Sequence, residues 1–106
     1  MNEPTLTHLQ FVILGLIREG VASGKELRAA LGEEGMRKSG PSFYQLMSRL
    51  EDSGWVTGRY RQSVVDGQII RERHYALTPD GSRALHASKA FYGRWIHRLD
   101  GGVAPA

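Results

Sequence analysis

The sequence predicts a mainly α-helical domain that carries one two-stranded β hairpin. Three observations support this fold class. Apolar residues recur at helical spacing in four stretches, and each stretch follows a Ser or Thr suited to starting a helix. A single Asp-Gly pair at positions 66–67 separates two segments rich in β-branched and aromatic residues. The chain has 106 residues, which is the length of one domain with a modest core.

The first two helices are each predicted from a capping residue and a closing glycine. Thr7 and Ser23 are followed three residues later by Gln or Glu, which is the spacing of a capping box. Apolar residues at helical spacing then run up to Gly20 in the first case and to Gly32 in the second. We therefore expect a longer helix, a short helix and a loose connection over residues 32–40.

The third helix is expected to start at Ser39, because Pro41 suits the first turn, and to end at Gly54. Its apolar side chains share one face, and its other exposed positions all carry hydrogen-bond donors. The expected buried face consists of Phe43, Leu46, Met47 and Leu50. The polar face consists of Ser42, Tyr44, Gln45, Ser48 and Arg49.

The Asp66-Gly67 pair predicts a two-residue type I′ turn, so that paired positions in the hairpin sum to 133. One side of the ribbon then gathers Val56, Tyr60, Tyr75 and Leu77 near a packed base, whereas the tip stays unpacked. Thr78 and Pro79 restart a helix that runs to about Leu99.

Charge is distributed unevenly, although the net charge is only +3. Residues 1–36 carry three Lys/Arg against five Asp/Glu, and residues 37–99 carry eleven against five. The densest group lies on the predicted ribbon and comprises Arg59, Arg61, Arg71 and Arg73. Charged side chains keep exposed sheet edges from aggregating, and they also bind polyanions. The basic C-terminal two thirds favours nucleic acid as the partner.

Three helices followed by a hairpin is the order of the winged helix-turn-helix, in which the third helix enters the major groove of DNA and the ribbon, or wing, lies along the backbone or minor groove. Gln45 and Arg49 suit base edges, and hydroxyl groups near the helix start suit phosphates. When the third helix is considered alone, the alternative interpretation of its polar side is an ordinary solvent-exposed surface without a binding role. The predicted DNA-binding residues are Lys38, Ser39, Ser42, Tyr44, Gln45, Ser48, Arg49, Arg59, Arg61, Arg71 and Arg73.

Several short motifs also resemble the PadR-like family of bacterial transcriptional regulators. They are the segments Phe11-Val-Ile-Leu-Gly-Leu-Ile17, Ser42-Phe-Tyr-Gln-Leu-Met-Ser-Arg-Leu-Glu51, Ser53-Gly-Trp-Val56 and Arg73-His-Tyr-Ala-Leu-Thr-Pro-Asp-Gly81. The resemblance spans about residues 6–85. It implies a dimeric, repressor-type regulator with the third helix and the wing on double-stranded DNA.

The last helix carries an aromatic-rich face that a monomer of this size has little left to cover. The resemblance implies that it packs against the first helix of a second copy, forming a homodimer. The expected interface residues are Leu9, Ile13, Leu85, Phe91, Tyr92, Trp95, Ile96 and Leu99. The alternative is that the helix folds over its own first helix. Some relatives hold flat aromatic ligands at this interface, so a small aromatic effector between Phe91, Tyr92 and Trp95 is a second possibility beside plain packing.

These patterns divide the chain into a winged helix-turn-helix domain (residues 1–78), a C-terminal dimerisation helix (79–100) and a flexible tail (101–106).

The sequence shows no recognisable set of nucleophile and base and no phosphate-cradling loop. It has no cysteine, and its histidines are not spaced to share a metal. We therefore expect neither an enzyme nor a cofactor or metal site. No segment approaches the roughly 20 apolar residues of a membrane span, and the start does not resemble a secretory signal, which favours a cytoplasmic protein. The alternative function is a winged-helix protein–protein adaptor that does not bind DNA.

Overall fold

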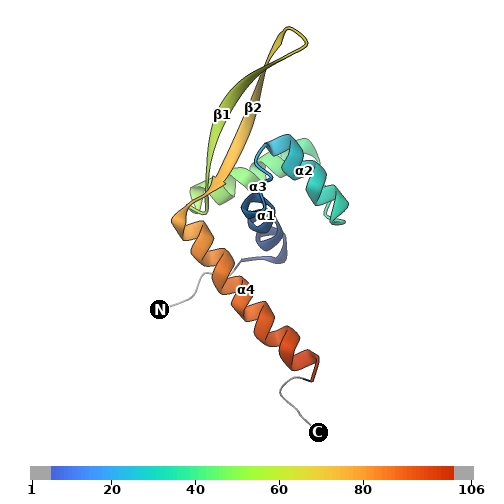
Figure 1. Ribbon diagram of the computed structural model, residues 1–106, viewed down its shortest axis with the longest axis vertical. Helices are drawn as coiled ribbons and strands as arrows, with labels where there is room; N and C mark the ends of the chain where they lie inside the picture. Colours follow the sequence, from blue (N-terminus) through green and yellow to red (C-terminus); the bar gives the residue numbers. More distant parts are fainter. Residues whose placement is uncertain (1–5, 102–106) are drawn as a thin grey trace.

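The computed structural model describes residues 6–101 and contains the predicted elements in the predicted order (Figure 1). The elements are α1 (His8–Arg18), α2 (Gly24–Glu33), α3 (Gly40–Asp52), β1 (Val56–Val65), β2 (Gln68–Leu77) and α4 (Pro79–Leu99). Helices α1 to α3 form the body, the β1–β2 hairpin projects from one end of it, and α4 extends in the opposite direction (Figure 1). Apart from Gly101, the expected tail over residues 101–106 lies outside the described residues.

The helix starts follow from local capping. Thr7 accepts a hydrogen bond from the Gln10 N–H (3.1 Å) and the Gln10 side chain accepts one from the Thr7 N–H (3.0 Å), which confirms the first capping box. At the second start, Ser23 accepts from the Glu26 N–H (3.1 Å), and the Glu26 carboxylate accepts from the Ser23 hydroxyl (2.9 Å).

The predicted end of α2 at Gly32 is wrong. The helix continues to Glu33, and the residue with left-handed backbone that follows it is Gly35 (φ 80°). The connection to α3 is consequently shorter than expected.

The core lies where the three body helices meet the base of the hairpin and the first half of α4. Side chains with no exposed area come from each body helix: Ile13, Leu14, Leu27, Leu31, Phe43, Met47 and Leu50. The face predicted for α3 is confirmed, with Leu46 packed at its margin. Val56 and Tyr75 close the core from the hairpin, and Ala84 and Leu85 close it from α4.

The hairpin has the predicted register, with Val56 opposite Leu77 and Val64 opposite Ile69. Asp66 (φ 51°) and Gly67 (φ 77°) both have left-handed backbone, as a type I′ turn requires. The base is held to the body because the Tyr75 N–H donates to the Ala22 carbonyl (2.9 Å). The expected packing of Tyr60 at the base is wrong, since 59% of its surface is exposed.

The direction of α4 is set by contacts between its first turn and the turn between α3 and β1. The Thr78 hydroxyl donates to the Gly54 carbonyl (2.5 Å) and accepts from the Gly81 N–H (2.9 Å), while the Thr78 N–H donates to the Trp55 carbonyl (3.1 Å). Gly81 lies so close to Trp55 that an added Cβ would overlap the Trp55 carbonyl oxygen. The first half of α4 is therefore part of the body, and only its second half stands clear.

Candidate nucleic-acid interface

The polar face of α3 is open to solvent. Ser42, Gln45, Ser48 and Arg49 are all exposed, and the apolar face on the opposite side of the helix anchors them to the body. Ser39 is the N-cap residue, and its hydroxyl accepts from the Ser42 N–H (3.2 Å). The helix start thus presents N–H groups and hydroxyls with no acidic side chain in its first turn, which is an arrangement that favours anions.

The four wing arginines divide between the two faces of the ribbon. Arg59 pairs with His74 and Arg61 pairs with Glu72, whereas Arg71 and Arg73 lie opposite Gln62 and Tyr60. Because side chains alternate along a strand, Arg59 and Arg61 lie on one face, and Arg71 and Arg73 on the other. This division follows from the predicted register, in which paired positions sum to 133, and the structure confirms that register.

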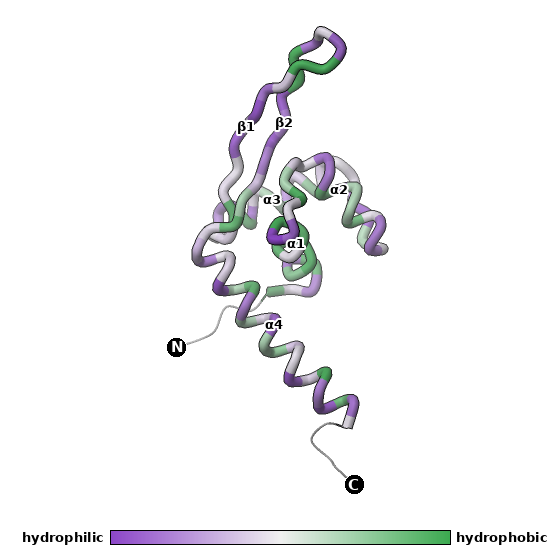
Figure 2. Tube along the Cα trace, in the orientation of Figure 1, coloured by the Kyte–Doolittle hydropathy of each residue, from purple (hydrophilic) through white to green (hydrophobic). Residues whose placement is uncertain are grey.

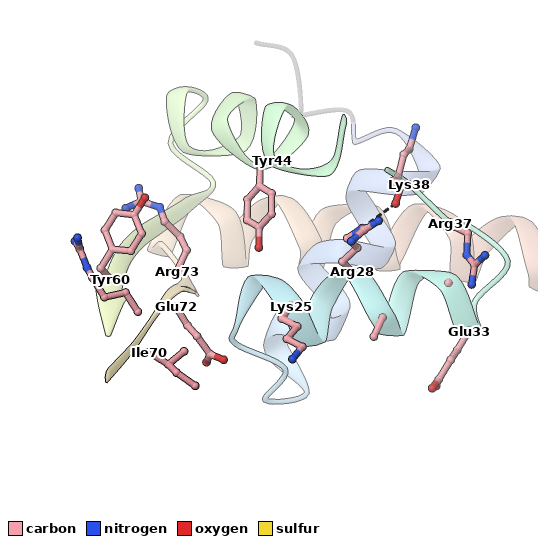
Figure 3. A pocket seen from close by; sticks show the side chains of 13 residues that line it. Lys25, Arg28, Glu33, Arg37, Lys38, Tyr44, Tyr60, Ile70, Glu72 and Arg73 are labelled. Carbon is pink, nitrogen blue, oxygen red and sulfur yellow. Dashed lines mark hydrogen bonds between the residues drawn. The ribbon is translucent and has the colours of Figure 1, made fainter. Parts of the chain in front are cut away.

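The ribbon forms a groove together with α2, the connection that follows it, and α3 (Figure 3). Its lining takes Tyr60, Arg71 and Arg73 from one ribbon face, and Ile70 and Glu72 from the other. Tyr44 of α3 projects between α2 and the wing, and its phenol lies against Gly24, where an added Cβ would come within 2.7 Å of the hydroxyl oxygen. Six cationic side chains line the groove: Lys25, Arg28, Arg37, Lys38, Arg71 and Arg73. Only two carboxylates, Glu33 and Glu72, accompany them, so the groove is strongly basic.

Three of those cations, Lys25, Arg28 and Arg37, were missed at the sequence level. Arg28 also shapes the groove, because its Nε donates to the carbonyl of Lys38 (2.9 Å) and so ties the connection to α2. The available signal was the spacing of Lys25, Arg28 and Gly32 along one face of a helix whose other face is apolar.

Arg73 differs from the other wing arginines. Its guanidinium is held by Glu51 of α3 at 2.6 Å, and only 27% of its side chain is exposed. Partial burial by itself lowers the pKa of Arg73, but the hydrogen bond and charge of Glu51 outweigh burial and leave this pKa raised. The assignment of Arg73 to DNA binding stays a prediction, and the structure shows that its charge is already paired inside the chain.

The end of the wing is apolar rather than basic. Figure 2 shows hydrophobic strand ends beside the turn, beyond hydrophilic middle sections of both strands. Val64, Val65 and Ile69 are exposed there. The phosphate-binding potential of the wing therefore lies in its middle, around Arg61 and Arg71.

The second half of α4 carries an exposed apolar stripe made of Phe91, Trp95, Ile96 and Leu99. The expectation that Ile13 and Leu85 belong to an interface with a second copy is corrected, since both are buried in the core of their own chain. Leu9 and Tyr92 are half-buried. The Tyr92 ring packs edge-on against Phe11 (5.1 Å between centroids) and Phe91 (5.6 Å), so these rings already contact one another.

Within residues 6–101 there is no group of His, Cys, Asp or Glu side chains that could hold a metal ion. Over the same residues, no helix has the length and hydropathy needed to cross a membrane.

Comparison with known proteins identifies the family. The model of the transcriptional regulator PadR-like family matches residues 13–87, which is more than two thirds of the chain. The chain belongs to the PadR-like family. It is accordingly a PadR-like transcriptional regulator with a winged helix-turn-helix fold, and the family is not one of enzymes.

The negative transcriptional regulator PadR of Bacillus subtilis is 32% identical over 81 residues, covering 74% of this chain and 43% of that protein. The chain thus spans less than half the length of this relative. The crystal structure of B. subtilis PadR in complex with operator DNA is 30% identical, with a TM-score of 0.62 over 76% of this chain and 46% of that one.

Two further PadR-like structures are similar over nearly the whole chain. The regulator from Clostridium difficile is 18% identical with a TM-score of 0.73, covering 93% of this chain and 100% of that one. The regulator from Bacillus cereus is 21% identical with a TM-score of 0.72, covering 92% and 93%. At these identities the two structures establish the shared fold.

Proposed function

We propose that this PadR-like regulator is a sequence-specific DNA-binding repressor that acts as a homodimer. In this proposal α3 enters the major groove and the wing lies on the phosphate backbone. The observation that carries it is the basic groove beside α3, in which α2, the connection to α3 and the wing together present six cationic side chains around Tyr44. The Bacillus subtilis relative is named a negative regulator, and it has been crystallised with operator DNA, which supports the same function here.

The side chains of α3 divide into two roles. Gln45 and Arg49 are assigned to base edges, because an amide can pair with adenine and a guanidinium with guanine in the major groove. Ser39, Ser42, Tyr44 and Ser48 are assigned to phosphates beside the start of the helix.

The wing is assigned to phosphates on both sides of the ribbon. Arg61 and Arg71 are exposed on opposite faces of the ribbon. They lie at adjacent positions along it, since Arg61 pairs with Glu72 and Arg71 pairs with Gln62. A ribbon that follows the minor groove has a DNA strand along each face, so the two arginines can each contact a different strand. Arg59 extends the Arg61 face of the ribbon. On the Arg71 side, Lys25 and Arg28 continue the basic surface along α2, and Arg37 and Lys38 continue it along the connection to α3.

The homodimer is assigned to the exposed stripe on α4. Phe91, Trp95, Ile96 and Leu99 form an apolar surface that residues 6–101 leave exposed, and such surfaces mark contacts between proteins. Leu9 and Tyr92 border it. A symmetric pair of chains would place two α3 helices on half-sites about 34–36 Å apart, or a multiple of that spacing.

Selection of bound duplexes from a random-sequence pool tests the proposal. We expect enrichment of an inverted repeat whose half-site centres are separated by about 10 base pairs or a multiple of that number. Enrichment of a single, non-repeated site would contradict the homodimer arrangement. Failure to retain any duplex at low salt would favour the alternative, a winged-helix adaptor that binds another protein.

A further inference from the structure

An ion pair links α3 directly to the wing. The Nη2 of Arg73 in β2 donates to Glu51 Oε1 near the end of α3, at 2.6 Å. The Arg73 guanidinium also lies over the ring of Tyr60, 4.9 Å from its centroid, and Arg71 lies over the same ring at 4.5 Å. Arg73 thus joins α3 to the part of the ribbon that carries Arg71.

The strand β1 passes beside Glu51 and Arg73, and a glycine on this strand leaves room for their contact. Gly58 lies on β1, and an added Cβ there would overlap Glu51 Oε1 and come within 2.9 Å of Arg73 Nη2. Its backbone does not require glycine through a left-handed φ. The close approach of the ion pair therefore accounts for the glycine at this position.

Stability alone is a weak reason for this arrangement. Only about a quarter of each side chain is exposed, and in a largely buried ion pair the loss of hydration offsets much of the attraction between the charges. The wing, however, is a two-stranded ribbon packed only at its base, and such a ribbon has little rigidity of its own. The ion pair at Arg73 lies just beyond the backbone contacts that hold the base of the ribbon, which are those of Tyr75 with Ala22 and of His74 with Ser23, and it is two residues from Arg71.

We infer that Glu51 and Arg73 are positioning residues: they fix the angle between α3 and the wing, and thereby hold the phosphate-binding arginines in register with the base-reading face of α3. Gly58 supports this ion pair, because a side chain at its position would overlap Glu51. The inference rests on the proposed DNA binding, and it assigns Arg73 a role through Glu51 rather than through phosphate.

The Glu51→Gln variant separates the two roles by the sign of its effect. It removes a negative charge beside the DNA surface and releases Arg73, so that a phosphate-binding Arg73 would give tighter binding. If the pair positions the wing, binding to the selected duplex should instead weaken by about tenfold, less than the roughly 30-fold expected for two lost phosphate contacts. Hydroxyl-radical protection should disappear from the flanking sugars, which the wing covers, and remain at the centre of each half-site.

Asp52→Asn is the matched control, because it makes the same charge change at the next residue of α3, where the carboxylate is exposed. We expect it to bind with unchanged or higher affinity and with full protection. Arg73→Lys supplies a second test that keeps the charge but replaces the planar guanidinium by a compact ammonium group. It should lose the flanking protection in the same way.

Urea unfolding of each variant shows whether the chain remains folded. Wild-type affinity or better, with full flanking protection, in both Glu51→Gln and Arg73→Lys would overturn the inference. Failure of the wild type itself to bind DNA would instead refute the proposed function, and the two results are therefore distinguishable.

Discussion

Replacing Arg61 with alanine should weaken binding to every duplex and flatten its dependence on salt. The Arg61 side chain is exposed in the middle of the wing, on the face opposite the Arg73 ion pair. The proposed dimer presents it twice, so the slope of log K against log salt should fall by about 1.8, at about 0.9 for each phosphate contact. If the electrostatic contribution vanishes near 1 M salt, this slope corresponds to a roughly 30-fold loss of affinity at 0.15 M.

The assay is fluorescence anisotropy on the selected duplex and on a random duplex, at several salt concentrations. Gln45→Ala is the comparison, because Gln45 is exposed on α3 and uncharged. It should leave the salt slope unchanged and reduce the preference for the selected duplex by about 1–3 kcal/mol per half-site. Equal losses for both variants on both duplexes, with equal slopes, would refute the division between phosphate-binding and base-reading residues.

Three further predictions concern stability and assembly. Gly81→Ala should lower the free energy of unfolding by about 1–3 kcal/mol in urea, because the new Cβ meets the Trp55 carbonyl; Gly32→Ala, which meets no atom within 4 Å, should instead gain up to about 1 kcal/mol. Trp95→Glu should convert dimers to folded monomers in sedimentation experiments, since Trp95 lies on the exposed stripe. Burial and a nearby carboxylate raise the pKa of Tyr75 above its ordinary value of 10.0, so its contribution to stability is complete below about pH 10 and is lost as pH rises through the folded-state pKa. Tyr75→Phe should remove that part of the alkaline decline, and an unchanged decline would contradict this assignment.

Features encoded by neighbouring residues were predictable from the sequence. The turn at Asp66-Gly67 and the caps at Thr7 and Thr78 depend on a few consecutive side chains and their own backbone. Once the turn type is known, the whole register of the hairpin follows. The end of α2 was less predictable, because Gly32 and Gly35 are both acceptable terminators and only one of them adopts the left-handed backbone.

Features that depend on distant residues were not predictable. Arg73 resembles Arg71 in sequence, but its partner Glu51 lies 22 residues away, across a strand that makes room only at Gly58. Which side of α1 faces the core is likewise decided by the packing of other elements, and for this reason Ile13 was assigned to an interface although the core encloses it completely.

The basic groove shows the same limitation. Lys25, Arg28 and Arg37 acquire a possible role only because the fold brings α2 and the connection after it opposite the wing. No short motif marks these residues, and their charges are compatible with any solvated helix. The sequence therefore predicted α3 and the wing, but not that α2 and the connection after it line the groove beside them.

In the proposed complex, α3 and the wing form one surface that engages a single duplex. Photo-crosslinking from Gln45 on α3 and from Gln62 on the wing, each replaced in turn by a photoreactive amino acid, shows whether both elements contact the same DNA. Both side chains are exposed, so neither replacement disturbs the core. We expect both positions to crosslink to the selected duplex, Gln45 within the half-site and Gln62 in the adjoining flank. Crosslinking from only one of the two elements would contradict the claim.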